Sequence, residues 1–153
     1  MKALSAVVSN AHKQAFAVEI EGATPMEYPY PQCCPAPTRE DPVVRVEVDP
    51  ELGFTGFVYF LASGSEGVVL SDHVLRYNRD PSYLVDEMLY ELSCEAKSRL
   101  ESSPIGIRAL GRRLETSPAQ IYRPVDPTNY GKTLDQMVRL LAVLEVDVQL
   151  LIR

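Results

Sequence analysis

The spacing of hydrophobic side chains changes once along the chain, close to residue 80. Before that point apolar and polar residues alternate, as in QAFAVEIEG (14–22) and VVRVEVD (43–49), which is typical of half-buried β-strands. Beyond it the apolar residues recur about every 3.6 positions, the period of a helix that buries one face. The fold class predicted from this change is α+β, with a small antiparallel β-sheet region followed by an all-α region.

The first 80 residues are expected to form one β-rich domain. FTGFVYFLA (54–62) is rich in the aromatic and β-branched residues that strands prefer, and a short VVL strand follows the turn signal SGSEG. Residues 16–71 are therefore predicted as one small, mostly antiparallel sheet. The segment 22–42 carries six prolines. Because proline removes backbone donors and fixes φ, this segment is predicted as an extended arm with neither helix nor central strand.

A long helix is predicted from residue 81. Asp80 can cap it, and Pro81 suits its first turn. A single apolar stripe follows, formed by Leu84, Met88, Leu92, Ala96 and Leu100. Spacings of four residues put these side chains on one face of a helix. We expect this helix to join the β-rich region to the helices that follow.

Two short helices are predicted next. Gly106 is an acceptable N-cap for a helix over 107–114, which exposes three arginines. Ser117 caps the second helix, with Pro118 at its first position and Gln120 in the third place of a capping box.

The C-terminal segment contains one more helix and an alternating stretch. Thr133 and Gln136 form a capping box for a helix over LDQMVRLLAVL, and EVDVQLLIR then alternates like a strand. That strand is expected to join the chain's own sheet or to pair with a second copy. The predicted domains are residues 1–80, which include the arm, residues 81–145, which are helical, and a terminal strand over 146–153.

The charges are distributed unevenly along the 153 residues, whose net charge is −6. Residues 1–96 carry 6 Lys and Arg against 15 Asp and Glu, a net of −9, whereas residues 97–153 carry 9 against 6, a net of +3. Such asymmetry indicates a basic part that binds nucleic acid, joined to an acidic part.

Several functional classes are disfavoured by composition. The three cysteines, Cys33, Cys34 and Cys94, do not form an even, spaced framework, which favours a reducing cytoplasm over a secreted disulfide protein. With His12 and His73 as the only histidines, neither a metal site nor a cofactor is predicted. No nucleophile, base and orienting group converge, so we expect no enzyme. No apolar run approaches 18 residues, so no membrane span is expected.

The spacing inside the two short helices is specific. Gly111 supplies the small residue that the first helix needs where the second crosses it, and Ile121 is the inward apolar residue ten positions later. The stretch LGRRLETSPAQIYRPVDPTNYGKTLDQMVRLLAVL resembles the Cro and lambda-repressor-like (Xre-type) helix-turn-helix family, above all its short antitoxin-like members. The resemblance covers residues 105–144. It implies that the all-α region is a helix-turn-helix bundle.

Two positions depart from the family pattern. Glu115 stands where the family usually has glycine; if the turn needs a positive φ, glutamate costs roughly 1 kcal/mol more than glycine. Pro124 stands where leucine is usual. It removes a hydrogen bond to the Gln120 carbonyl and is expected to limit the second helix to residues 118–123.

The resemblance implies a DNA contact surface around the start of the second helix. Its residues are Arg108, Thr116, Ser117, Ala119, Gln120, Tyr122, Arg123, Asn129 and Lys132. Gln120 is expected to hydrogen-bond adenine, and Arg123 to bind guanine or a phosphate. The hydroxyl groups of Thr116, Ser117 and Tyr122 suit phosphates, and Arg108, Asn129 and Lys132 suit backbone contacts. The alternative for each side chain is a solvated charge or a helix cap.

Two hypotheses for function follow. The first is a sequence-specific, cytoplasmic, homodimeric regulator of transcription that binds double-stranded DNA, for example an antitoxin whose acidic N-terminal half binds a toxin. The second is a protein-interaction or adaptor module that keeps the helical scaffold but no longer binds DNA.

Overall fold

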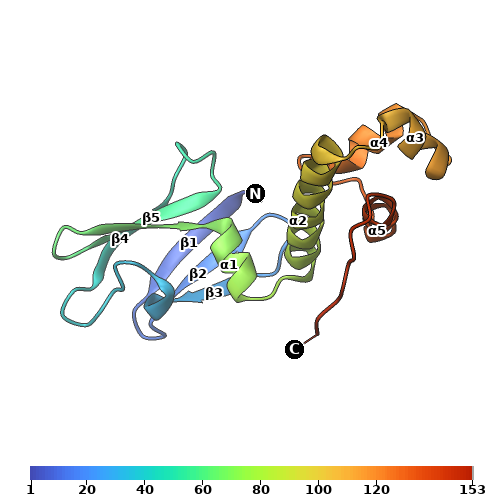
Figure 1. Ribbon diagram of the computed structural model, residues 1–153. Helices are drawn as coiled ribbons and strands as arrows, with labels where there is room; N and C mark the ends of the chain where they lie inside the picture. Colours follow the sequence, from blue (N-terminus) through green and yellow to red (C-terminus); the bar gives the residue numbers. More distant parts are fainter. Residues whose placement is uncertain (153) are drawn as a thin grey trace. The chain divides into compact units, whose positions relative to one another are not determined.

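The computed structural model describes residues 1–152, which form two compact units, unit 1 (Met1–Tyr83) and unit 2 (from Leu84 onward). The strands of unit 1 are β1 (Leu4–Asn10), β2 (Ala15–Ile20), β3 (Met26–Pro29), β4 (Val43–Val48), β5 (Gly56–Leu61) and β6 (Glu66–Leu70), with a 3-10 turn η1 (Tyr30–Gln32) after β3. The helices are α1 (Ser71–Tyr77), α2 (Pro81–Ser102), α3 (Ile107–Arg113), α4 (Pro118–Val125) and α5 (Leu134–Val143) (Figure 1).

Unit 1 contains two antiparallel sheets of three strands each, in the orders β1-β2-β3 and β4-β5-β6. Each strand therefore pairs with its neighbour in sequence, and short turns suffice to connect them. Strands β2 and β5 are the central ones, so both of their edges are hydrogen-bonded. Their alternate residues point to the interior: β2 buries Phe16, Val18 and Ile20, and β5 buries Phe57, Tyr59 and Leu61.

One aromatic cluster joins the two sheets. The ring centroid of Phe16 lies 4.9 Å from that of Phe57, 5.2 Å from that of Tyr59 and 5.0 Å from that of Tyr30. These are the tilted arrangements that aromatic pairs prefer. Cys33 packs into the same core, and burial raises the pKa of its thiol to about 11. The thiol is therefore protonated at neutral pH and a poor nucleophile.

Helices α2 to α5 share the core of unit 2. The buried apolar side chains are Leu89 and Ala96 of α2, Leu110 of α3, Ile121 and Val125 of α4, and Met137, Leu140 and Leu141 of α5, with Leu144 after it. Each of the three short helices contributes through residues spaced three or four apart or through a single leucine. None is long enough to be stable alone in water, so this shared core holds them.

The predicted fold class is wrong. The sequence predicted one N-terminal sheet followed by an all-α helix-turn-helix bundle with a terminal strand. Residues 1–152 instead form two small three-stranded sheets, one N-terminal and one central, and then five helices, the first of which lies in unit 1. Residues 146–152 contain no strand. Leu150, Leu151 and Ile152 are exposed there. An alternating pattern forms a strand only when a partner strand takes its backbone hydrogen bonds.

Three elements of unit 1 were missed for identifiable reasons. A β-bulge between Leu4 and Ala6 interrupts the alternation of β1. Strand β3 lies inside the proline-rich arm, at a sheet edge, the position where a strand tolerates proline. Helix α1 is only 7 residues long and its N-cap makes no side-chain hydrogen bond, so it carries no start signal.

A close contact in the second sheet gives a test of this packing. Gly67 on β6 pairs with Tyr59 on β5, and a Cβ at Gly67 would lie 2.1 Å from the Tyr59 hydroxyl oxygen. That ring is fully buried and its hydroxyl donates to the Pro35 carbonyl at 2.6 Å, so it cannot move aside freely.

Gly67→Ala is expected to destabilise unit 1 by about 1–3 kcal/mol through overpacking, measured by urea unfolding. The control is Val68→Ala on the same strand, where the side chain is half exposed and the loss should be under about 1 kcal/mol. Equal stability of the G67A variant and the native chain would contradict the contact.

Candidate nucleic-acid interface

Helix α3 ends in a backbone motif that closes a tight turn. The Thr116 amide donates to the Gly111 carbonyl at 2.8 Å and the Glu115 amide to the Arg112 carbonyl at 3.3 Å. This pair of bonds is a Schellman motif, which needs a left-handed residue at the position after the cap. Glu115 takes that position with φ 52°. The positive φ that the sequence pattern suggested is therefore present.

The same turn explains the glycine in α3. A Cβ on Gly111 would lie 2.7 Å from the Thr116 carbonyl oxygen and 3.9 Å from Cδ1 of Ile121. Only glycine allows the backbone of the turn to come so close to α3. Gly111 was predicted as the small residue where the second helix crosses the first; the group that requires glycine is instead the turn backbone, and Ile121 of α4 lies at ordinary contact distance.

Helix α4 begins at the predicted cap but uses only half of the predicted capping box. The Ser117 side chain accepts a hydrogen bond from the Gln120 amide at 3.4 Å. The reciprocal bond, in which the Gln120 side-chain oxygen would accept from the Ser117 amide, is not formed. Gln120 is exposed, and among the described residues its side-chain amide has no hydrogen-bond partner. The group expected to hydrogen-bond a base edge is therefore free.

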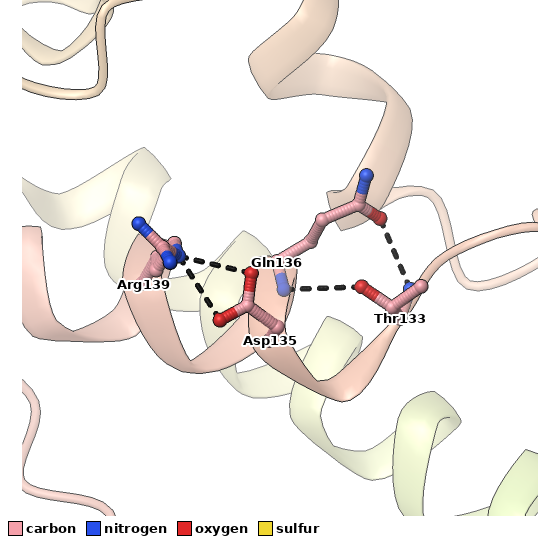
Figure 2. Close-up of polar contacts among 4 residues, drawn as sticks. All are labelled: Thr133, Asp135, Gln136 and Arg139. Atoms are coloured by element: carbon pink, nitrogen blue, oxygen red, sulfur yellow. Dashed lines mark hydrogen bonds and ion pairs between the residues drawn. The ribbon is translucent and has the colours of Figure 1, made fainter.

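Helix α5 shows what a complete capping box looks like in the same unit. The Thr133 hydroxyl accepts from the Gln136 amide at 3.3 Å, and the Gln136 side-chain oxygen accepts from the Thr133 amide at 3.0 Å (Figure 2). Gln136 is thus occupied, whereas Gln120 at the matching position of α4 is not. Two glutamines at the same capping position therefore differ: the Gln136 side chain is hydrogen-bonded within its helix, and the Gln120 side chain is free to bind another group.

Pro124 does not end α4 where the sequence predicted. The helix continues to Val125, which is only 5% exposed. Proline removes one backbone donor and one intrahelical hydrogen bond. Burial of Val125 in the core of unit 2 offsets that loss, so tertiary packing extends the helix past the residue that its local sequence disfavours.

Lys132 closes the C-terminal end of α4 from inside the protein. The residue is 6% exposed. Its ammonium group donates to the carbonyl of Asp126 at 2.8 Å, to that of Pro124 at 3.3 Å and to the hydroxyl of Ser93 on α2. Burial lowers its pKa, opposed by the Asp126 carboxylate. Lys132 is therefore a buried cap for α4, and it lines the same hollow as Gln120 and Arg123 of the predicted surface.

The loop between α4 and α5 is held by its own side chains. Asn129 donates to the Arg123 carbonyl at 3.0 Å and accepts from the Gly131 amide at 3.0 Å. Asp126 accepts from the amide and hydroxyl of Thr128 at 2.9 and 2.7 Å, which lowers its pKa. Asn129, predicted to contact phosphate, therefore has a structural role in the loop.

The remaining predicted residues lie on α3, on the α3–α4 turn and on α4. Arg108, Ser117, Ala119, Gln120, Tyr122 and Arg123 are exposed, and Thr116 is half-buried. We call these residues, together with Arg112 and Arg113, the α3–α4 face. The last two arginines are exposed on α3 and were not among the predicted contacts. Their position at the end of α3, next to the turn, is the sequence signal from which they could have been predicted as contact residues.

The arginines of this face differ from others in unit 2 in having no acidic partner. The Arg99 Nε lies 2.6 Å from the Glu95 Oε1. The Arg139 Nε lies 2.9 Å from the Asp135 Oδ2, a pair drawn in Figure 2. Within residues 1–152, none of the four arginines of the α3–α4 face forms an ion pair. Residues 103–125 contain these four arginines and a single acid, Glu115. The positive charge of the C-terminal part is therefore concentrated and unneutralised there.

A hollow of about 280 Å³ adjoins this face. Its wall includes Gln120 and Arg123 from α4 and Gln136 and Arg139 from α5. Polar and cationic groups thus surround an open space beside the start of α4. Among residues 1–152, no group of three or more His, Cys, Asp or Glu side chains could hold a metal ion.

Comparison with known proteins adds no relative. No family model, no curated protein and no solved structure matches this chain. The resemblance to the Xre-type family stays a prediction that rests on the residues of 105–144. None of the helices in the described part of the chain is long and apolar enough to cross a membrane.

The left-handed Glu115 predicts a stabilising substitution. Glu115→Gly should raise the free energy of unfolding of unit 2 by about 0.5–1 kcal/mol, because relief of the left-handed penalty exceeds the added entropy of the unfolded chain. The measurement is urea unfolding followed by far-UV circular dichroism. Glu115→Ala is the matched control: it removes the same side chain but keeps a Cβ, so no comparable gain is expected. An equal effect of both variants would contradict strain at this residue.

The buried ammonium group predicts a loss of stability when it is removed. Lys132→Met should destabilise unit 2 by about 2 kcal/mol, since it leaves two carbonyl groups and the buried Ser93 hydroxyl without their donor. Lys97→Met, an exposed lysine of α2, is the control and should have little effect. If K132M left stability unchanged and weakened only DNA binding, Lys132 would be a phosphate contact instead of a cap.

Proposed function

We propose that this chain is a sequence-specific DNA-binding protein whose α3–α4 face enters the major groove. The observation that carries the proposal is the free side chain of Gln120 at the exposed start of α4, together with four arginines of α3 and α4 that form no ion pair within residues 1–152. An amide side chain can bond the N6 and N7 edge of adenine, and arginine the O6 and N7 edge of guanine. Donors of both kinds are thus available on one short helix.

The division of roles follows from position. Gln120 and Arg123 lie on α4 and are assigned to bases, whereas Arg108, Arg112 and Arg113 lie on α3 and are assigned to phosphates. Phosphate contacts fix the register of a protein on the duplex, and base contacts give the sequence preference. The hydroxyl groups of Thr116 and Ser117 in the turn are suited to a phosphate oxygen. Two copies of the chain are proposed to bind two half-sites about 34 Å apart, one helical turn of DNA.

A second candidate is an adaptor that uses the same face to bind a protein. Unit 2 as a whole carries 9 basic and 10 acidic side chains, a net of −1, which would repel DNA at long range. Tyr122, more than half exposed on α4, is of the residue type enriched in protein interfaces. We prefer the DNA hypothesis because the acidic residues of α2 and the four arginines of residues 103–125 occupy separate segments of the sequence.

The test is selection of bound duplexes from a random DNA pool by the full chain, repeated at low and moderate salt. A palindromic motif that persists at moderate salt is expected. Arg123→Ala should then weaken binding to the selected site by about 1–3 kcal/mol and relax the preference at one base pair. Arg112→Ala should weaken binding to all sequences alike and reduce the slope of log affinity against log salt by about 1.

The control for both variants is Arg99→Ala on α2, whose guanidinium is already paired with Glu95. Its affinity should match that of the native chain. Failure to enrich any motif, or binding that disappears with salt for every sequence, would exclude sequence-specific binding and favour the adaptor.

A further inference from the structure

A second hollow lies wholly within unit 1, beside the turn that joins β1 to β2. Its volume is about 340 Å³, at the lower end for sites that bind small molecules. Its lining includes Ser9, His12, Tyr30, Thr38 and Arg39. These residues come from three separate parts of the sequence. No motif therefore indicates the hollow, which only the folded chain assembles.

A pair of hydroxyl groups forms one wall of the hollow. The Ser9 Oγ and the Tyr30 hydroxyl oxygen lie 2.6 Å apart, and either group can be the donor. Tyr30 is 4% exposed and its ring packs against Phe16, so its position is fixed. Because one hydroxyl donates to the other, the second keeps a hydrogen for another acceptor. Among residues 1–152, neither oxygen has a further hydrogen-bond partner.

The backbone around the hollow is also fixed. Gln14 adopts a positive φ of 53° in the β1–β2 turn, and its carbonyl accepts from the Tyr30 amide at 2.9 Å. On the other side, the Asp41 amide donates to the Thr38 hydroxyl at 3.0 Å. The lining is thus ordered before any ligand arrives, which lowers the entropy lost on binding.

The charges of the lining are positive or neutral in a unit that is acidic. Unit 1 carries 6 basic and 11 acidic side chains, a net of −5, yet no carboxylate lines the hollow. The nearby Asp41 carboxylate accepts from the amide and hydroxyl of Ser63 at 2.7 and 2.8 Å. Lys13 is paired with Glu27. In residues 1–152, Arg39 has no ion pair, so its guanidinium is available.

We infer that this hollow binds a small molecule carrying an oxyanion, a carboxylate or a phosphate group. The planar guanidinium of Arg39 matches two oxygens of either group. The hydroxyl hydrogen that the Ser9–Tyr30 pair retains supplies a further donor, and His12 belongs to the same lining. Pro42 and Val43, also in the lining, offer apolar contacts for the rest of the ligand. This inference is independent of the proposed DNA binding, because the two sites share no residue.

The experiment uses amide NMR spectra of the full chain, titrated separately with sodium phosphate and sodium acetate. Sodium chloride keeps the ionic strength constant, so that general screening does not change. Saturable shifts are expected at the amides of Ser9, His12 and Arg39. Arg39→Gln should weaken binding about tenfold or more, because it removes a charge-assisted contact. Ser9→Ala should weaken it by a smaller factor.

The control is Arg45→Gln on β4. Arg45 is exposed, lies 4.1 Å from the centroid of the Phe60 ring and does not line the hollow, so its loss should leave binding unchanged. Saturation with phosphate alone assigns a phosphate ligand, and saturation with acetate alone assigns a carboxylate. Shifts that do not saturate, or an affinity that R39Q leaves intact or that R39Q and R45Q reduce equally, would overturn the inference.

Discussion

The buried ammonium group of Lys132 is the contact on which the helical unit most depends. It joins α2 to the last carbonyl groups of α4 through Ser93, Pro124 and Asp126. Helix α4 has only 8 residues and contains a proline, so its own hydrogen bonds cannot keep it formed. The lysine satisfies carbonyls that such a short helix leaves without donors. The end of α4 that carries Gln120 is free for a ligand because the opposite end is held from within the protein.

At the start of α4, too, the groups that stabilise the helix are different from the side chain that stays exposed. Close approach of the turn to Gly111 fixes the path of the chain between α3 and α4, and the Ser117 hydroxyl accepts from the Gln120 amide in the first turn of α4. Backbone and hydroxyl groups thus form the cap without the Gln120 side chain. A complete box, as in α5, would use the glutamine to stabilise the helix and withdraw it from the surface. The half box is less stabilising and leaves the Gln120 side chain exposed.

The local signals in the sequence predicted the helical elements better than the fold. Serine and proline at positions 117 and 118 gave the correct start of α4, because a cap acts through neighbouring atoms. Its end, however, depends on burial of Val125 and on Lys132, which belong to the tertiary structure. The second sheet was likewise not separable from the first, because alternation gives the faces of a strand and not its partner. The hollow around Arg39 needs residues that only folding brings together, so no sequence pattern could indicate it.

The available positive charge of the helical unit lies on particular arginines and not on the unit as a whole. The net charge of residues 97–153 suggested a basic domain, but α2 adds acids to the same unit, and the unit as a whole is slightly negative. What distinguishes the arginines is their spacing from carboxylates along a helix, since residues four apart face each other. Arg99 and Arg139 have an acid four residues before them and are paired. Arg112, Arg113 and Arg123 have Arg108, Ala109 and Ala119 at that position. Their positive charge therefore stays available to a phosphate or a base. Once the helix positions are known, the sequence is enough to tell these unpaired arginines from the paired ones.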